Sequence, residues 1–309
     1  MSHHTGRGIS LGFVVICLIA LGGILYYFID QLSADLPGSA AVAATRQVRP
    51  VLHEAAASGD AAAITAALKA GAQIDAPADA SSASAGLTPL HCAALAGKPE
   101  SVQALLNAGA KVSARTKDGK TALIYAAGWG TPATVAAVLD GKPNVNERTD
   151  DRWTALMIAA SRGDPGSIKA LIDAGANVND KNKWGQTALM AAARVGDAEK
   201  VLLLLQAGAE VNELDTDGLT ALAFACSADD SIECVKALLA AKADHSIVDN
   251  QGVTPLMRAA DVADVEKLKA ILAAGARKDI KDRDGRLAVD WAKQRDDEAG
   301  RAAAVILEK

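Results

Sequence analysis

Residues 86–94 read Gly-Leu-Thr-Pro-Leu-His-Cys-Ala-Ala, and a shortened form of this stretch recurs along most of the chain. The form is Gly-x-Thr-(Pro/Ala)-Leu, with Arg152 in place of the glycine once, and its threonines are Thr88, Thr121, Thr154, Thr187, Thr220 and Thr254. Their successive spacings are 33, 33, 33, 33 and 34 residues. A constant period of this length is typical of stacked supersecondary units, none of which can bury its apolar face alone.

Each period contains the signals for two short helices and a turn, as residues 187–218 illustrate. The Thr-Ala-Leu-Met-Ala-Ala of 187–192 predicts a first helix that is capped by its threonine and whose alanines allow close approach of the second helix. A Gly-Asp turn at 196–197 and the apolar residues 201–205 predict a second helix. The glycine of Ala-Gly-Ala at 207–209 predicts a left-handed helix end, and Asp-Gly at 217–218 predicts a tight turn.

This pattern resembles the ankyrin repeat family, whose motif G-x-T-P-L-H-x-A-A is matched most closely by residues 86–94. The resemblance covers residues 46–309 and implies an all-α solenoid of helix–turn–helix units with hairpin fingers. We count about seven repeats, the first degenerate, and a C-terminal cap that begins at Gly285. Because Arg152 replaces a turn glycine, we expect that turn to be distorted.

The composition excludes several classes of protein. Hydrophobic residues make up 50% of the 309 residues, but aromatic residues make up only 3%, so alanine and leucine must form a core of closely packed helices. A net charge of −5 excludes a generally basic nucleic-acid binder. Four cysteines exclude a disulfide scaffold, and five histidines leave little material for a metal site.

Residues 9–29 carry no charge and are long enough, as a helix of roughly 31 Å, to cross a bilayer. Arg7 precedes this segment, whereas Asp30 and Asp35 follow it and no basic residue appears before Arg46. The positive-inside rule therefore predicts a cytoplasmic N-terminus, with the rest of the chain on the other side of the membrane.

The predicted organisation is a cytoplasmic tail at 1–8, a membrane span at 9–29, a linker at 30–45 and an ankyrin repeat domain at 46–309. A short tail and a plain anchor resemble a bacterial inner-membrane protein that is single-pass and faces the periplasm. The alternative is a cleaved signal peptide, because Ala-Val-Ala at 41–43 has the small-x-small form of a cleavage site.

Three short stretches match parts of known enzyme or metal-binding motifs, but their positions in the sequence do not support an enzyme or metal site. The G-x-S-x-G of residues 8–12 lies at the entry to the membrane span, and the Asp-rich stretches 215–218 and 282–285 match hairpin turns rather than calcium loops. His53 and His91 stand where the family has a structural histidine. We therefore predict no catalytic residue, no cofactor, no metal and no small-molecule substrate.

Cys226 and Cys234 fall in the two helices of one repeat, at positions that face each other in the core. The favoured interpretation is a pair of packed thiols that act as small hydrophobic residues. The alternative is a disulfide, which an oxidising compartment across the membrane would permit.

In proteins of this family the partner meets the fingers and the exposed ends of the first helices, on the concave surface. Trp129, Trp153 and Trp184 fall on these positions in three successive repeats, together with Arg162 and Arg194. Tryptophan and arginine are enriched at binding hot spots, so these five residues form the predicted site. The alternative is that each tryptophan braces its own hairpin.

The predicted function is a non-catalytic module, tethered to the membrane, that binds a protein partner and no nucleic acid. A narrower alternative is an immunity or stress-protection protein that counters a secreted toxin or an oxidant-linked system. The repeats leave no room for a catalytic domain, and an eight-residue tail is too short for a signalling output.

Overall fold

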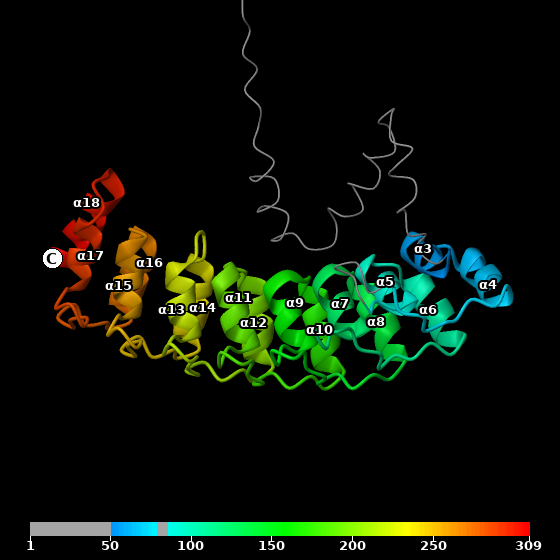
Figure 1. The fold of residues 1–309 in the computed structure, drawn as a ribbon. Helices are drawn as coiled ribbons and strands as arrows, with labels where there is room; N and C mark the ends of the chain where they lie inside the picture. Colours follow the sequence, from blue (N-terminus) through cyan, green and yellow to red (C-terminus); the bar gives the residue numbers. More distant parts are fainter. Residues whose placement is uncertain (1–50, 79–85) are drawn as a thin grey trace, which may run out of the picture. The chain divides into compact units, whose positions relative to one another are not determined.

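The computed structural model describes residues 51–78 and 86–309, which form sixteen α-helices and no strand. The helices follow one another in eight pairs that stack in chain order, from α3 and α4 at one end to α17 and α18 at the other (Figure 1). The first helices of the pairs are α3 (Val51–Ser58), α5 (Pro89–Leu95), α7 (Ala122–Trp129), α9 (Ala155–Arg162), α11 (Ala188–Val195), α13 (Ala221–Ser227), α15 (Pro255–Asp261) and α17 (Ala288–Lys293). The second helices are α4 (Ala61–Lys69), α6 (Pro99–Asn107), α8 (Pro132–Asp140), α10 (Pro165–Asp173), α12 (Ala198–Gln206), α14 (Ile232–Ala240), α16 (Val265–Ala273) and α18 (Glu298–Glu308).

The predicted all-α repeat stack is thus confirmed over the two described ranges. Within them, none of the helices combines the length and the apolar character that a membrane crossing requires. The predicted tail at 1–8, span at 9–29 and linker at 30–45 lie outside the described residues, as does the alternative cleavage site at 41–43.

The recurring threonine starts the first helix, as predicted. In four repeats its hydroxyl accepts a hydrogen bond from the backbone N–H three residues on, at 3.2–3.3 Å; these are Thr154, Thr187, Thr220 and Thr254. Such a cap satisfies one of the donors that a helix start leaves unpaired. The second helices begin in the same way at Asp60, Asp164, Asp197 and Asp264, whose carboxylates accept from the first turn.

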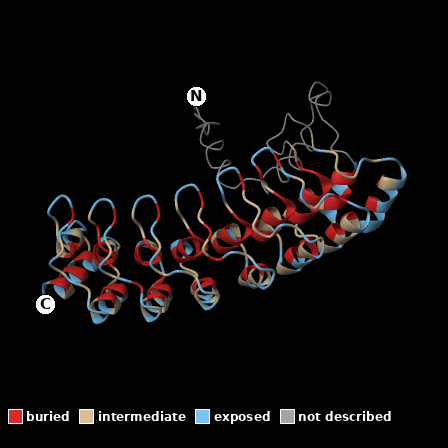
Figure 2. Ribbon diagram, turned by 90° about the horizontal axis from the view of Figure 1, so that it is seen from below, coloured by how far each residue is buried: buried red, intermediate tan, exposed pale blue. Residues whose placement is uncertain are grey.

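The core lies between the two rows of helices, where Figure 2 shows the facing sides as buried. Each first helix from α5 to α15 contributes two adjacent small residues that are at most 1% exposed: 93–94, 126–127, 159–160, 192–193, 225–226 and 259–260. Each second helix opposite contributes a fully buried aliphatic residue: Leu105, Val138, Leu171, Leu204, Leu238 and Ile271. Small residues let the helices approach closely enough for these larger side chains to fill the remaining space.

Cys226 occupies the place that alanine holds in the other repeats, and Cys234 lies on α14 of the same pair. Both residues are fully buried and carry free thiols in the structure, and the alternative of a disulfide between them stays a prediction. Burial raises the pKa of the Cys226 thiol to about 12 and that of the Cys234 thiol to about 11. Thiols with such pKa values remain protonated at physiological pH and pack as small hydrophobic groups.

The fingers, which connect each pair to the next, form a ladder along one edge of the stack. One backbone hydrogen bond of 2.9–3.3 Å joins each pair of neighbouring fingers. The donor N–H and acceptor carbonyl pairs are Asp150 to Asp118, Lys183 to Asp151, Thr216 to Trp184, Asn250 to Asp217, and Arg283 to Gln251. Inside a finger, the carboxylates of Asp215, Asp249 and Asp282 accept from the N–H groups two and four residues on, at 2.7–3.0 Å. The Asp-rich stretches therefore use their first carboxylates to shape turns.

A second ladder joins the loops that follow the second helices. The amide oxygen of Asn146 accepts from the N–H of Asn177 in the next loop at 2.8 Å, and Asn179 accepts from Glu210 at 2.9 Å. The amide nitrogen of Asn179 also donates to the carbonyl of Gly208 at 3.2 Å. The two asparagines occupy the same place in successive loops, each directly after a valine, Val145 and Val178, and each joins its loop to the next.

The turn at Arg152 keeps its shape, so the prediction of a distorted turn is wrong. The glycines at the same position of five other fingers have φ between 72° and 81°, and Arg152 has φ 64°. Its N–H donates to the carbonyl of Thr149 at 2.8 Å, as Gly119 donates to Thr116 at 3.0 Å. The surrounding ladder holds the backbone in place, and the arginine takes a conformation that favours glycine.

Candidate partner-binding surface

The fingers and the first helices share one side of the stack, which we call the finger face. Its finger segments are 115–120, 148–153, 181–186, 214–219 and 248–253, and its helices are α7, α9, α11, α13 and α15. Side chains from the middle of first helices reach the fingers: Arg258 on α15 pairs with Asp249. Figure 2 shows the fingers as a row of largely exposed loops beside the helices.

Trp129 and Arg162, two of the predicted site residues, meet on the finger face. Each is the last residue of its helix, α7 and α9. The Arg162 guanidinium lies over the Trp129 ring, 5.3 Å from its centroid. The centroid of the Tyr125 ring lies 5.9 Å from that of Trp129. A cation over an indole face is attracted by the ring quadrupole, so this contact orients both side chains.

Trp153 and Trp184 form a second pair on neighbouring fingers. Their ring centroids are 6.5 Å apart, within the range of favourable aromatic contact. Trp153 is half-buried against the core, whereas Trp184 is 46% exposed. In the same two fingers, the Lys183 and Asp151 side chains form an ion pair at 2.8 Å.

The backbone of Trp184 is fixed on both sides. Its N–H donates to the amide oxygen of Asn182 at 2.9 Å, and its carbonyl accepts from the N–H of Thr216 at 2.9 Å. Asn182 is buried and also accepts from the N–H of Gln186, so the turn that carries the tryptophan is held by two hydrogen bonds to one side chain. The exposed indole therefore stands on a preorganised base.

Trp291, the fourth tryptophan, is a brace rather than an exposed anchor. Its indole N–H donates to the Asp282 carboxylate at 3.0 Å, and the Arg286 guanidinium stacks on its ring at 4.4 Å from the centroid. Burial acts to raise the pKa of Asp282, but hydrogen bonds from Arg286 and Trp291 outweigh it and hold the pKa below its ordinary value. Trp184 has no comparable hydrogen bond from its ring in the described part of the chain.

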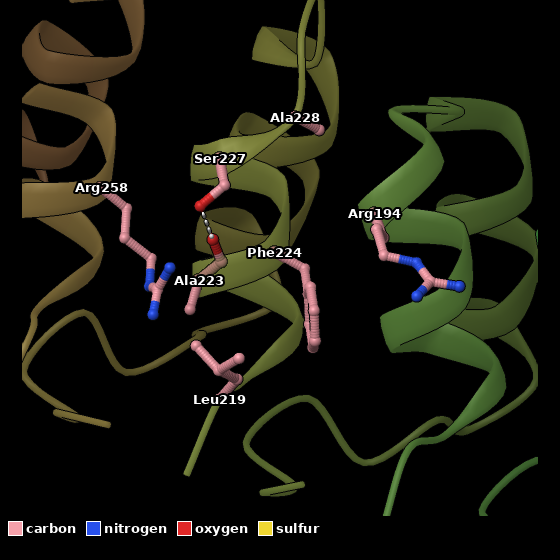
Figure 3. A pocket seen from close by; sticks show the side chains of 7 residues that line it. All are labelled: Arg194, Leu219, Ala223, Phe224, Ser227, Ala228 and Arg258. Atoms are coloured by element: carbon pink, nitrogen blue, oxygen red, sulfur yellow. Dashed lines mark hydrogen bonds between the residues drawn. The ribbon is translucent and has the colours of Figure 1, made fainter. Parts of the chain in front are cut away.

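Arg194, the fifth predicted residue, lies at the edge of a hollow of about 250 Å³ between α11, α13 and α15. Figure 3 shows the hollow lined by Phe224 and Ser227 of α13, with Arg258 on one side and Arg194 on the other. Leu219, Ala223 and Ala228 complete the lining.

The structure thus arranges the five predicted residues as two contacting pairs and one separate arginine. Sequence reasoning missed Tyr125, Phe224 and Arg258, which lie in the middle of first helices. Each is the fourth residue after its capping threonine, a half-buried place that faces the fingers. Comparing this position across the repeats would have found them.

His91 is structural, as the sequence indicated. Its Nδ1 accepts from the Thr88 N–H at 3.1 Å, and Nε2 lies 3.1 Å from the carbonyl of Ala114, to which it donates as the neutral tautomer. Burial lowers the pKa of His91 to about 4, so the imidazole is neutral at physiological pH. His53 similarly bonds the carbonyl of Leu87 at 3.1 Å. Across residues 51–78 and 86–309, no group of three or more His, Cys, Asp or Glu side chains is placed to hold a metal.

A family model described as ankyrin repeats (3 copies) matches the chain at residues 52–148, 132–215 and 192–282. These matches together extend over about three quarters of the 309 residues. No curated protein sequence matches the chain significantly.

Proposed function

Because the chain belongs to the ankyrin repeat family, we propose that its stack is a non-catalytic module that binds a protein partner on the finger face. Ankyrin repeats generally mediate protein–protein interaction. The proposed contacts are Trp129, Trp153 and Trp184, together with Arg162 and Arg194. The observation that carries this choice is the 46% exposure of Trp184 beside a second tryptophan.

An exposed indole on a rigid base is well suited to binding. Burying an aromatic ring of this size against a partner removes a large apolar area from water. The backbone bonds of Trp184 and its contact with Trp153 have already fixed most of its freedom, so little ordering entropy remains to be lost on binding.

The proposal extends to the membrane. Residues 9–29 would anchor the chain in the inner membrane of a bacterium, with residues 1–8 in the cytoplasm. Residues 30–45 would form a linker, and residues 46–309 would face the periplasm. The uncharged sequence of 9–29 and the charges around it support this arrangement. Anchoring raises the concentration of the finger face near partners at the same membrane.

Immunity or stress protection would use the same surface, because either role requires that a partner be held. The identity of the partner, a secreted toxin or a component of an oxidant-linked system, separates these roles from scaffolding.

In-cell crosslinking with mass spectrometry tests the binding proposal. The wild type is compared with a Trp129→Ala, Trp153→Ala, Trp184→Ala variant whose helical circular dichroism is unchanged. We expect one protein to be captured by the wild type and lost from the variant. Capture of the same protein by both would mean that the tryptophans are braces and that binding lies elsewhere.

A reporter that is active only in the periplasm, fused after Lys309, tests the topology. We expect activity from this fusion and none from a matched reporter that works only in the cytoplasm. The opposite pair of results would reverse the proposed orientation.

A further inference from the structure

Two arginines and an aromatic residue line the hollow between α11, α13 and α15 on the finger face. Arg194, Phe224 and Arg258 come from three successive repeats and line one space of about 250 Å³. Figure 3 shows Phe224 between the two arginine-bearing helices.

Arg258 is held in place but only partly satisfied. One of its terminal nitrogens pairs with the buried carboxylate of Asp249, which itself is fixed by the N–H groups of Gln251 and Val253. The Nε of Arg258 is buried and has no hydrogen-bond partner among residues 51–78 and 86–309. A guanidinium carries five N–H donors, so the pairing with Asp249 leaves other N–H groups of Arg258 without a partner at the hollow within these described residues.

Arg194 has no hydrogen bond or ion pair with any residue in the described ranges, although the chain contains more acidic than basic residues, 37 against 32. Figure 3 shows its stem at the edge of the hollow and its guanidinium extended along α11. An exposed, unpaired side chain changes rotamer within nanoseconds, so Arg194 can turn toward a bound group.

The rest of the lining is largely apolar and already satisfied. Phe224 packs on the core from one side and faces the hollow from the other, beside Leu219 and Ala223. The Ser227 hydroxyl donates to the carbonyl of Ala223 at 3.2 Å. The Ala228 edge is fixed by Ser231, whose hydroxyl lies 2.9 Å from the Ala228 carbonyl, and by Lys267, which donates to the same oxygen.

We propose that this hollow binds a single carboxylate of the protein partner, between Arg194 and Arg258, with an adjacent apolar side chain of the partner against Phe224. The inference rests on the proposed function and specifies the chemistry of the segment that enters. Two arginines and Asp249 leave one net positive charge, which a carboxylate neutralises and a phosphate dianion would overcompensate. Arginine binds carboxylate oxygens through two parallel hydrogen bonds, so the match includes geometry as well as charge.

A carboxylate reaches such a site either from an Asp or Glu side chain or from the C-terminus of the partner. The test therefore uses two libraries of random dodecapeptides, one with free C-terminal carboxylates and one with C-terminal amides. Both are screened against the full chain in detergent micelles, and dissociation constants of the selected peptides are measured by fluorescence anisotropy.

The diagnostic variant is Arg194→Gln, because Arg194 is exposed and its side chain makes no hydrogen bond or ion pair within the part of the chain that the structure describes. Arg301→Gln on α18 is the matched control, with the same charge change at an exposed site remote in the sequence. Arg194→Lys keeps the charge without the paired donors and should recover part of the affinity. Arg258 is left unchanged because its removal would strand the Asp249 carboxylate.

We expect the selected peptides to be enriched in a carboxylate next to an apolar residue. Arg194→Gln should weaken their binding at least tenfold, and Arg301→Gln should leave it unchanged. Enrichment in the amide library assigns the carboxylate to a side chain, whereas enrichment confined to the free-acid library assigns it to a C-terminus.

Peptides selected without a carboxylate preference, or equal affinity of the wild type and Arg194→Gln, would overturn the inference and leave the proposed function standing. Enrichment of peptides with phosphorylated residues over carboxylates, in a third library that contains both, would also overturn it. Failure to select any peptide would count against both the inference and the proposed function.

Discussion

Replacing Arg152 by glycine should stabilise the protein. Arg152 holds a left-handed backbone conformation with φ 64°, which costs a non-glycine residue about 1–2 kcal/mol. Its exposed side chain makes no hydrogen bond or ion pair within the described ranges, so its truncation removes no such contact. Glycine at this position lowers the free energy of unfolding by about 0.5–1 kcal/mol, because it increases the conformational entropy of the unfolded chain. The net gain should be about 0.5–1 kcal/mol in the free energy of unfolding.

Two further sites repeat the test. Lys142 and Lys242 follow second helices, where other repeats have glycine, and have φ 53° and 65°. Lys142→Gly and Lys242→Gly should each give a gain similar to that of Arg152→Gly. Because the three sites lie in different repeats, their effects should add. Lys117→Gly is the matched control: it removes a long basic side chain from a finger position where φ is not positive, so it should lose about 0.5 kcal/mol.

Urea unfolding followed by circular dichroism measures these changes. The Arg152→Gly midpoint should rise with an unchanged slope, and the melting temperature should rise by about 1–4 °C. If Arg152→Gly loses stability as Lys117→Gly does, the arginine side chain contributes more than the backbone strain costs, and the strain argument is refuted.

Three more predictions follow from buried groups and from the loop ladder. The pKa of His91 is about 4 in the folded protein and 6.5 in the unfolded chain, so the unfolded chain binds the proton first as pH falls. The free energy of unfolding of the wild type should therefore fall by about 2 kcal/mol between pH 7 and 5, and that of His91→Gln should not show this fall. Equal losses in the two proteins would contradict this. Cys226 and Cys234 should stay unlabelled by iodoacetamide at pH 8 until urea is added, and a mass two units lower before reduction would reveal a disulfide instead. Asn179→Ala removes the bonds to the next loop and should lower the free energy of unfolding by about 1 kcal/mol, whereas no change would mean that water replaces them fully.

The repeat architecture could be predicted because its signals are local and recur six times. Thr154 and Thr187 cap helices by geometry that depends on neighbouring residues alone. The turn at Arg152 could not be predicted in the same way. The conformation of this turn is imposed by hydrogen bonds to the neighbouring fingers. The one residue that departs from the repeat pattern does not reveal how strongly those hydrogen bonds hold the turn.

The candidate site was predicted only as a set of positions. Counting placed Trp153 and Trp184 in successive repeats, but the contact between their rings depends on side-chain rotamers and on the spacing of the fingers. Phe224 and Arg258 escaped notice because the middle of a first helix looks like core in the sequence. Only the structure shows that this position faces a hollow as well.

Site-specific photocrosslinking tests the central claim most directly, that the finger face holds a protein partner. A photoreactive phenylalanine analogue is placed at Trp184 in one variant and at Leu202, on α12, in another; both residues are 46% exposed. We predict a discrete crosslinked protein from position 184 and none from position 202 in the same cells. Equal adducts from both positions, or an adduct from Leu202 alone, would contradict the account.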